Sequence, residues 1–301
     1  MKQDCRTPFC ARGMAGWRWR WVIRWMFAGL IAVAGFTMET RAEEKLRPVP
    51  FFAFDNGVGR GTWSPERQAS TLAELGYDGI GYSGVDDFAE RAAAFDRRGL
   101  KIFNLYVGAV VGPDGPTFDP KLPAAIEALR GREMALWLTV NGKATDADAQ
   151  AASVVTTIAD LAAKAGVRVV LYPHAGFHIA RVEDAVRVAR LAGRPNVGVT
   201  FNLCHFLKVD DANHLKACLQ EAMPLLEFVS INGADAGETN EMDWDRLIQP
   251  LGSGSFDVRS VVTFLDELGY AGPIGLQCYN VAGDPVDNLR RSLATWRKWH
   301  E

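Results

Sequence analysis

The chain has 301 residues, of which 48% are hydrophobic, and a formal net charge of −3. Residues 1–42 contain seven basic and two acidic residues, so without them the remaining 259 residues carry a net charge of −8. An acidic domain without a cluster of Lys and Arg does not fit a nucleic-acid-binding protein, and we predict no such partner. A domain of this size can bury the core of one barrel or of two small domains.

The first segment has the layout of a secretory signal peptide. A basic opening precedes an apolar run from Trp25 to Met38, and Thr40-Arg41-Ala42 places small residues where a signal peptidase cleaves. The run of about 14 residues is short for a membrane anchor, although an uncleaved tether stays the alternative. We predict a signal peptide at residues 1–42, a folded domain at 43–301, export to the periplasm or the extracellular space, and no integral membrane domain after cleavage.

Three cysteines, Cys204, Cys218 and Cys278, remain after residue 42. Their odd number and the lack of a short CxxC spacing fit neither a disulfide scaffold nor a zinc knuckle. We therefore expect buried thiols, with one disulfide still possible.

Short β-rich runs alternate with amphipathic helical segments from residue 51 onward. The predicted strands are Phe51–Phe54, Gly79–Ser83, Lys101–Val107, Ala135–Val140, Val167–Tyr172, Val197–Leu203, Phe228–Asn232 and Ile274–Cys278. The clearest predicted helices are Pro65–Leu75, Ala149–Ala165, Val182–Leu191, His214–Met223 and Val258–Leu268. Eight β–α units in about 250 residues favour a single closed (β/α)₈ TIM barrel over an open sheet.

Alternation along the strands predicts which side chains face the barrel interior. In the run 197–203, Val199 and Phe201 face the helices, so Thr200 and Asn202 face inward. The same alternation points further polar and aromatic side chains inward, namely Trp137, Asn141, Ser230, Asn232 and Gln277. The interior therefore becomes polar at the C-terminal ends of the strands, where the active sites of such barrels lie.

Six stretches of the sequence carry a resemblance to a known family. They are Gly76-Tyr77-Asp78-Gly79, Arg98-Gly99-Leu100-Lys101-Ile102, Tyr172-Pro173-His174, the run from Asn196 to His205, the run from Leu251 to Asp257, and Gly269-Tyr270-Ala271-Gly272-Pro273-Ile274. Together they resemble the xylose isomerase-like sugar phosphate isomerase/epimerase superfamily. The resemblance implies a TIM barrel that acts on sugars or related compounds.

The resemblance also implies a divalent metal held by a Glu after strand five, an Asp in strand six, a His in strand seven and a Glu in strand eight. Matched by motif, these positions are Tyr172, Asn202, Asn232 and Gln277, with Ser230 as a second match for the histidine. Because Mn²⁺ and Mg²⁺ sites depend on anionic oxygen ligands, we predict that the family metal site is lost or weakened. No cofactor is predicted, although a weak Mn²⁺ or Mg²⁺ site, or a relocated one at His174, His178 and His205, stays open.

Without a metal, the acid and base groups must come from side chains. Imidazole titrates nearest neutral pH, so His174 and His205 are the predicted catalytic residues. The predicted substrate-binding residues are Tyr172, Asn202, Asn232, Gln277, Asn141, Asn104, Trp137 and Asp55. Lys143, Lys208 and Asp235 follow strands and are weaker candidates, since solvated loop residues and helix caps look the same in sequence.

These observations predict an exported sugar isomerase/epimerase-like protein that acts on an unphosphorylated saccharide or keto-sugar by His-mediated proton transfer. The same prediction includes a lyase that acts on carbohydrates. The alternative is a catalytically silent carbohydrate-binding barrel that has lost the family metal site, and a third is a metal-dependent enzyme with a rearranged site. In each case the partner is a small carbohydrate, and the oligomeric state is left open.

Overall fold

Eight parallel strands close into a barrel in residues 46–301, the part of the chain that the computed structural model describes. Each strand pairs with the next, and β9 pairs back with β1. The barrel strands are β1 (Phe51–Phe54), β2 (Gly79–Ser83), β3 (Lys101–Val111), β5 (Ala135–Gly142), β6 (Arg168–Leu171), β7 (Val197–Asn202), β8 (Leu226–Ile231) and β9 (Ile274–Leu276). The predicted single (β/α)₈ barrel is confirmed, while the predicted signal peptide lies outside the described residues.

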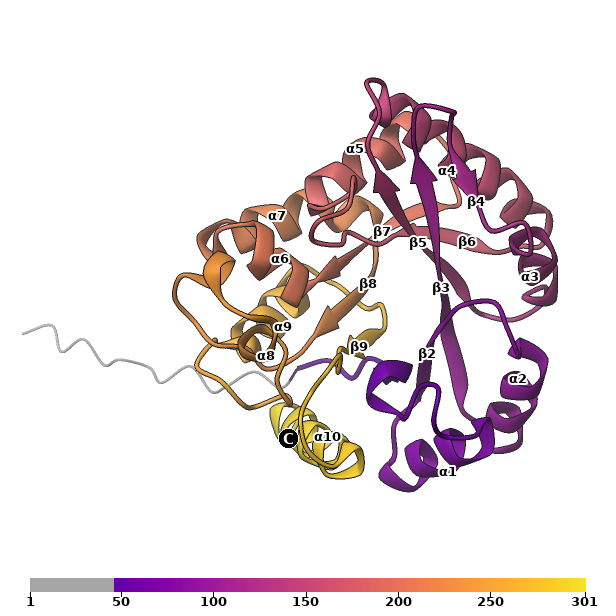
Figure 1. Cartoon of the computed structure of the whole chain (residues 1–301). Helices are drawn as coiled ribbons and strands as arrows, with labels where there is room; N and C mark the ends of the chain where they lie inside the picture. Colours follow the sequence, from indigo (N-terminus) through magenta and orange to yellow (C-terminus); the bar gives the residue numbers. More distant parts are fainter. Residues whose placement is uncertain (1–45) are drawn as a thin grey trace, which may run out of the picture. The chain divides into compact units, whose positions relative to one another are not determined.

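Helices surround the strands on the outside of the barrel (Figure 1). They are α1 (Pro65–Leu75), α2 (Phe88–Arg97), α3 (Leu122–Ala128), α4 (Ala147–Lys164), α5 (Val182–Ala192), α6 (Leu203–Val209), α7 (Leu215–Ala222), α8 (Trp244–Leu247), α9 (Val258–Glu267) and α10 (Pro285–Trp299). Ser64 caps the start of α1, and Gly76 ends it in the left-handed conformation with φ of 91°, as glycine at that position predicts. In the part of the chain described, no helix is long and apolar enough to cross a bilayer.

Six of the eight predicted strands have bounds that differ by one to four residues from the observed ones, namely β3, β5, β6, β7, β8 and β9. Two of these differences bear on the site. β3 continues to Val111 because its end pairs with the end of β5 on one side and forms an antiparallel hairpin with β4 (Thr117–Phe118) on the other. β7 stops at Asn202, since α6 begins at the next residue without a connecting loop. His205 therefore lies in a helix, whereas the sequence analysis predicted no helix at this position.

Alternation of side chains divides the interior into two cores, as predicted. Val199, Phe201 and Ile231 belong to the outer core between strands and helices. The core inside the barrel is aromatic, and its members are Phe52, Phe54, Phe103, Ala135, Trp137, Val170, Tyr172 and Phe228. Burying an aromatic side chain contributes about 1.5–3 kcal/mol to the stability of the fold. These packed rings fill the barrel interior below the cavity.

A β-bulge in β3 breaks the alternation at one point. The pairing of β2 with β3 shifts between Ile80 and Gly81, which lie opposite Ile102 and Asn104. Phe103 packs inside the barrel, and Asn104 lines its cavity. Bulges re-aim side chains in this way.

Cys204, Cys218 and Cys278 are buried and unpaired. The expectation of buried thiols is confirmed for these three residues.

Candidate active site

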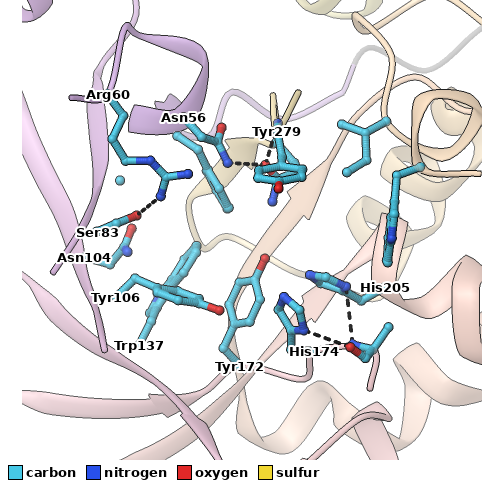
Figure 2. Close-up of a pocket in the computed structure, with 16 residues that line it drawn as sticks. Asn56, Arg60, Ser83, Asn104, Tyr106, Trp137, Tyr172, His174, His205 and Tyr279 are labelled. Carbon is cyan, nitrogen blue, oxygen red and sulfur yellow. Dashed lines mark hydrogen bonds between the residues drawn. The ribbon is translucent and has the colours of Figure 1, made fainter. Parts of the chain in front are cut away.

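A cavity of about 430 Å³ opens at the C-terminal ends of the barrel strands (Figure 2). Its volume lies in the range of small-molecule sites, about 300–1,000 Å³, and it occupies the end at which such barrels place their active sites. The lining residues are Phe54, Asn56, Arg60, Gly81, Ser83, Asn104, Tyr106, Trp137, Tyr172, His174, Ala175, His205, Trp244, Ile248, Gln277 and Tyr279.

Two imidazole rings lie together in the wall of this cavity. His174 follows β6 and His205 belongs to α6, and their ring centroids are 4.1 Å apart at an interplanar angle of 41°. Phe177 stacks on His174 at 4.1 Å, and Trp244 contacts His205 edge-on at 5.5 Å. Each imidazole thus contacts an aromatic side chain as well as the other imidazole, and these contacts restrict both rings.

The backbone of Ala175 gives the two imidazoles different hydrogen-bonding roles. Its N–H donates to His205 Nδ1 at 3.4 Å, and its carbonyl oxygen lies 3.0 Å from His174 Nδ1. A carbonyl only accepts, so His174 Nδ1 carries the proton and its Nε2 has a free lone pair. In neutral His205 the proton is on Nε2 instead, because Nδ1 is the acceptor.

Burial keeps both imidazoles uncharged. Desolvation lowers the pKa of His174 below 6.5. Desolvation, and then repulsion by His174, hold the pKa of His205 well below 6.5. At pH 7 His174 is therefore a neutral acceptor through Nε2, and His205 is a neutral donor through Nε2–H.

An ion pair joins the two segments that carry the histidines. Arg181 Nη1, at the start of α5, lies 2.9 Å from Asp210 Oδ2, at the end of α6, and the Asp210 side chain is only 7% exposed. The β6–α5 loop holding His174 is thereby tied to the helix holding His205.

Lys208 ties the same helix to the loop on its other side. Its Nζ donates to the carbonyl oxygens of Asn240 and Met242, both at 2.7 Å. This loop leads to Trp244, which packs on His205. Lys208 does not line the cavity, so its contacts hold the wall in place.

We expect Lys208→Met to lower the free energy of unfolding by about 1 kcal/mol, because the part-buried Met242 carbonyl and the exposed Asn240 carbonyl lose a charged donor. Urea unfolding of the purified variant measures this. Lys143→Met, at an exposed position, is the matched control and should change stability by less than about 0.5 kcal/mol. Equal effects of the two substitutions would show that the Lys208 contacts contribute nothing.

Two of the five amides expected at the mouth line the cavity: Asn104 and Gln277. Within the described residues Asn104 Oδ1 has no hydrogen-bond partner, and neither has Trp137 Nε1, which lines the same cavity. Buried polar atoms without partners are costly. A hydroxyl-bearing ligand would satisfy both, since a hydroxyl donates and accepts.

Gln277 Oε1 accepts three N–H groups, from Asn56 Nδ2 at 2.6 Å, Cys278 N at 2.9 Å and Tyr279 N at 3.0 Å. This oxygen therefore organises the loop after β9 and has no free lone pair for a ligand.

The other three amides do not line the cavity. Asn202 is buried, donates to Pro173 O and Thr200 Oγ1, and accepts from Ser230 Oγ. Asn232 is also buried, and its Nδ2 donates to Gly233 O and Leu247 O. Asn141 is exposed at the end of β5, which continues past the barrel interior beside β3.

Aromatic rings form the floor of the cavity. Trp137 lies 5.3 Å from Tyr172, and Tyr106 meets Tyr172 edge-on at 5.0 Å. Burial raises the pKa of Tyr172 well above 10, so its phenol stays protonated.

The cavity is not entirely uncharged, because Arg60 lines it. Asp55 lies behind this wall, where it accepts from Ser83 N and Ser83 Oγ, both at 2.9 Å, and is 3.7 Å from Arg60 Nη1. Burial raises the pKa of Asp55, and Arg60 opposes the rise. Asp55 therefore balances the guanidinium charge and does not reach the cavity itself.

The four positions that match the family's metal ligands do not fit a divalent cation. They offer a protonated phenol, the saturated oxygen of Gln277, Asn202 Oδ1 bonded to Ser230, and Asn232 Oδ1, which is outside the cavity lining. None of these is an anionic oxygen. Among residues 46–301 no group of three or more His, Cys, Asp or Glu side chains is placed to hold a metal ion.

The remaining candidates are paired outside the cavity. His178 Nε2 lies 2.9 Å from Asp148 Oδ1, so His178 does not join the other two histidines. Asp235 pairs with Arg246 at 2.9 Å.

Sequence reasoning missed Asn56, Arg60, Ser83, Trp244 and Tyr279, all of which line the cavity. Each lies at or soon after the end of a strand, except Trp244, which is twelve residues beyond Asn232. A systematic search of the residues after every predicted strand would have found four of them.

Comparison with known proteins agrees with this architecture. Apo 3-keto-D-glucoside 4-epimerase from E. coli has a TM-score of 0.67 at 20% identity, covering 83% of this chain and 100% of that one. D-allulose 3-epimerase from Methylomonas sp. has a TM-score of 0.65 at 17% identity, covering 86% and 99%. The probable 3-DHS dehydratase from Bacillus anthracis has a TM-score of 0.65 at 10% identity, covering 83% and 99%.

No curated protein sequence matches the chain significantly. The profile of the xylose isomerase-like TIM barrel family matches residues 69–299. This match spans most of the chain and agrees with the closed barrel, so the protein belongs to the xylose isomerase-like TIM barrel family.

Proposed function

We propose that the protein is an exported isomerase or epimerase of an unphosphorylated sugar or keto-sugar, and that His174 and His205 transfer the proton. The observation that carries this proposal is the pair of neutral imidazoles with opposite tautomers in one cavity. Two structural neighbours, a 3-keto-D-glucoside epimerase and a D-allulose epimerase, act on such sugars according to their names. The N-terminal sequence supports export.

In the proposed reaction, His174 Nε2 removes a proton from the carbon beside the substrate carbonyl, and the C–H electron pair forms the C=C bond of an enediolate. His205 Nε2–H donates a hydrogen bond to the carbonyl oxygen, which takes up the negative charge. Water returns a proton to the other face of the carbon to give the epimer, and the proton on His174 passes to the resulting hydroxide. Return of the proton from His174 to the neighbouring carbon, with the hydroxyl proton moving to the former carbonyl oxygen, gives the isomer. Trp137 Nε1 and the Asn104 amide hold substrate hydroxyls.

A carbohydrate-binding barrel without catalysis is the second candidate. It is favoured by the neutral residues at the family's ligand positions, because no anionic oxygen at Tyr172, Asn202 or Gln277 supports a metal.

Deuterium exchange separates the candidates. We expect the purified protein in D₂O to incorporate deuterium next to the carbonyl of at least one member of a panel of aldoses, ketoses and keto-glycosides, as followed by NMR. Treatment with EDTA should leave the rate unchanged. Sugar binding without exchange would support the binding protein instead. Stoichiometric Mn, Zn or Mg in the purified protein, with exchange lost in EDTA, would support a metal-dependent enzyme.

A further inference from the structure

Tyr279 is the exposed aromatic residue of the cavity wall. It is 53% exposed, whereas Trp137 and Tyr172 are each 1% exposed at the floor. In Figure 2 it lies in the upper part of the view, with Tyr172 and His174 in the lower part. A single exposed ring is ordinary on a protein surface, but this one forms part of a concave site. The cavity thus has an aromatic residue at its mouth in addition to those at its floor.

The backbone fixes the position of this ring. Val281 N donates to Cys278 O at 3.3 Å, which closes a turn with Tyr279 and Asn280 at its centre. Asn280 has φ of 55°, a left-handed conformation that Asn tolerates better than most residues. Tyr279 N donates to Gln277 Oε1 at 3.0 Å. The fold therefore presents the ring at the mouth, although few side chains cover it.

The charges around the cavity favour a neutral ligand. No Asp, Glu or Lys lines it, in the part of the chain that the structure describes, and Arg60 is its one formally charged side chain. Arg60 donates to Ser83 Oγ at 3.0 Å and lies 3.7 Å from the Asp55 carboxylate. A guanidinium that already has a carboxylate partner gains little from a second anion.

We infer that Tyr279 is the stacking platform of an outer subsite, and that the ligand is a neutral glycoside whose sugar enters the cavity while its aglycone ring lies on Tyr279. This inference rests on the proposed function. A ring face packs well on an aromatic face. A glycoside has no free carbonyl at its anomeric carbon, so the ketone that acidifies the C–H bond must be on the sugar ring. The substrate class is then a keto-glycoside, and the reaction is an epimerisation beside the ketone.

Calorimetric titration with stable glycosides tests the outer subsite. The probes are the methyl and phenyl glycosides of D-glucose and D-galactose in both anomeric forms, together with cellobiose and maltose, which carry a pyranose as the second ring. We expect the phenyl glycoside or the disaccharide to bind about two- to tenfold tighter than the methyl glycoside of the same sugar, as one aromatic stacking contact provides. The second ring that gives the tighter binding, phenyl or pyranose, identifies the kind of aglycone.

Variants of Tyr279 decide whether this ring is responsible. Tyr279→Ala should reduce the ratio of the two affinities to about one, while Tyr279→Phe should keep it, because the ring and not the hydroxyl stacks. Leu191→Ala, at a 59% exposed position on α5 outside the cavity lining, is the matched control and should also keep the ratio. An unchanged ratio in Tyr279→Ala, or no preference in the unmodified protein, overturns the outer subsite and leaves the proposed function standing. Failure of every probe to bind also overturns the outer subsite, and the proposed function falls with it only if no aldose, ketose or keto-glycoside of the panel exchanges deuterium.

Discussion

Replacing His174 with glutamine is expected to lower the rate of deuterium exchange by about two to four orders of magnitude, the usual contribution of a positioned general base. Glutamine keeps a similar length and polarity but has no lone pair of suitable basicity. His174 Nδ1 is bonded to Ala175 O, so Nε2 is the nitrogen to which the proposed mechanism assigns the substrate proton. Exchange measured by NMR at saturating substrate reports the loss.

The pH profile distinguishes a base from a positioning residue. Burial lowers the pKa of His174, so the neutral base is present at pH 7 and is lost only as the pH falls through a value below 6.5. We expect the exchange rate of the unmodified protein to be flat above pH 7 and to fall below 6.5. This acid limb should disappear from the residual rate of His174→Gln and persist in His205→Ala. His214→Gln, at a side chain 70% exposed, should retain both rate and profile. An intact rate in His174→Gln would remove this residue from the mechanism.

Phe52→Ala is expected to lower the free energy of unfolding by about 3–5 kcal/mol, the usual cost of deleting a buried phenyl ring. Phe52 is fully buried inside the barrel, stacks on Phe103 at 4.5 Å and contacts Trp137 at 6.1 Å. A Cβ on Gly81 or Gly275 would come within 3.0 Å and 2.7 Å of its ring atoms. The backbone of two neighbouring strands thus lies against the ring on two sides. Because strand backbone cannot move into the space that alanine leaves, a cavity remains.

Urea unfolding followed by circular dichroism measures this loss. Leu191→Ala removes a large side chain from an exposed position and should change stability by less than about 0.5 kcal/mol. A loss below about 1 kcal/mol in Phe52→Ala would mean that the barrel interior repacks. Because Trp137 rests against Phe52, we also expect the variant to bind the sugar ligand more weakly than the unmodified protein does.

The fold was predictable because buried strands have strong local patterns. Val197–Asn202 reads as alternating large and small residues, and both of its faces are buried. The strand ends were less predictable, since they depend on partners distant in sequence. β3 extends to Val111 because its end pairs with β4 on one side and with the end of β5 on the other.

The sequence predicted Asn202 and Asn232 as residues of the site, but it could not predict their hydrogen-bond partners. Both amides are bonded by backbone carbonyls of loops, Pro173 for the first and Leu247 for the second. The path of a loop is set by tertiary packing, which a one-dimensional pattern does not contain. The two residues therefore bind loops at the C-terminal ends of β7 and β8 and do not line the cavity.

Loop residues were the hardest to predict. Arg60 and Tyr279 reach the cavity because of turns that follow β1 and β9, and Trp244 arrives from a short helix after β8. Asn104 reaches it because a bulge re-aims its side chain. The roles that we assign to all the lining residues stay predictions until ligands and variants are measured.

The contacts of Ala175 have a consequence for how this site tolerates sequence change. Its N–H and C=O, and not its methyl group, select which nitrogen of each imidazole carries the proton. Most substitutions at position 175 would keep these main-chain atoms, so the assignment of donor and acceptor is robust to mutation there. The protonated nitrogen of each imidazole therefore depends on the path of the β6–α5 loop. A sequence motif that records only side chains does not reveal it.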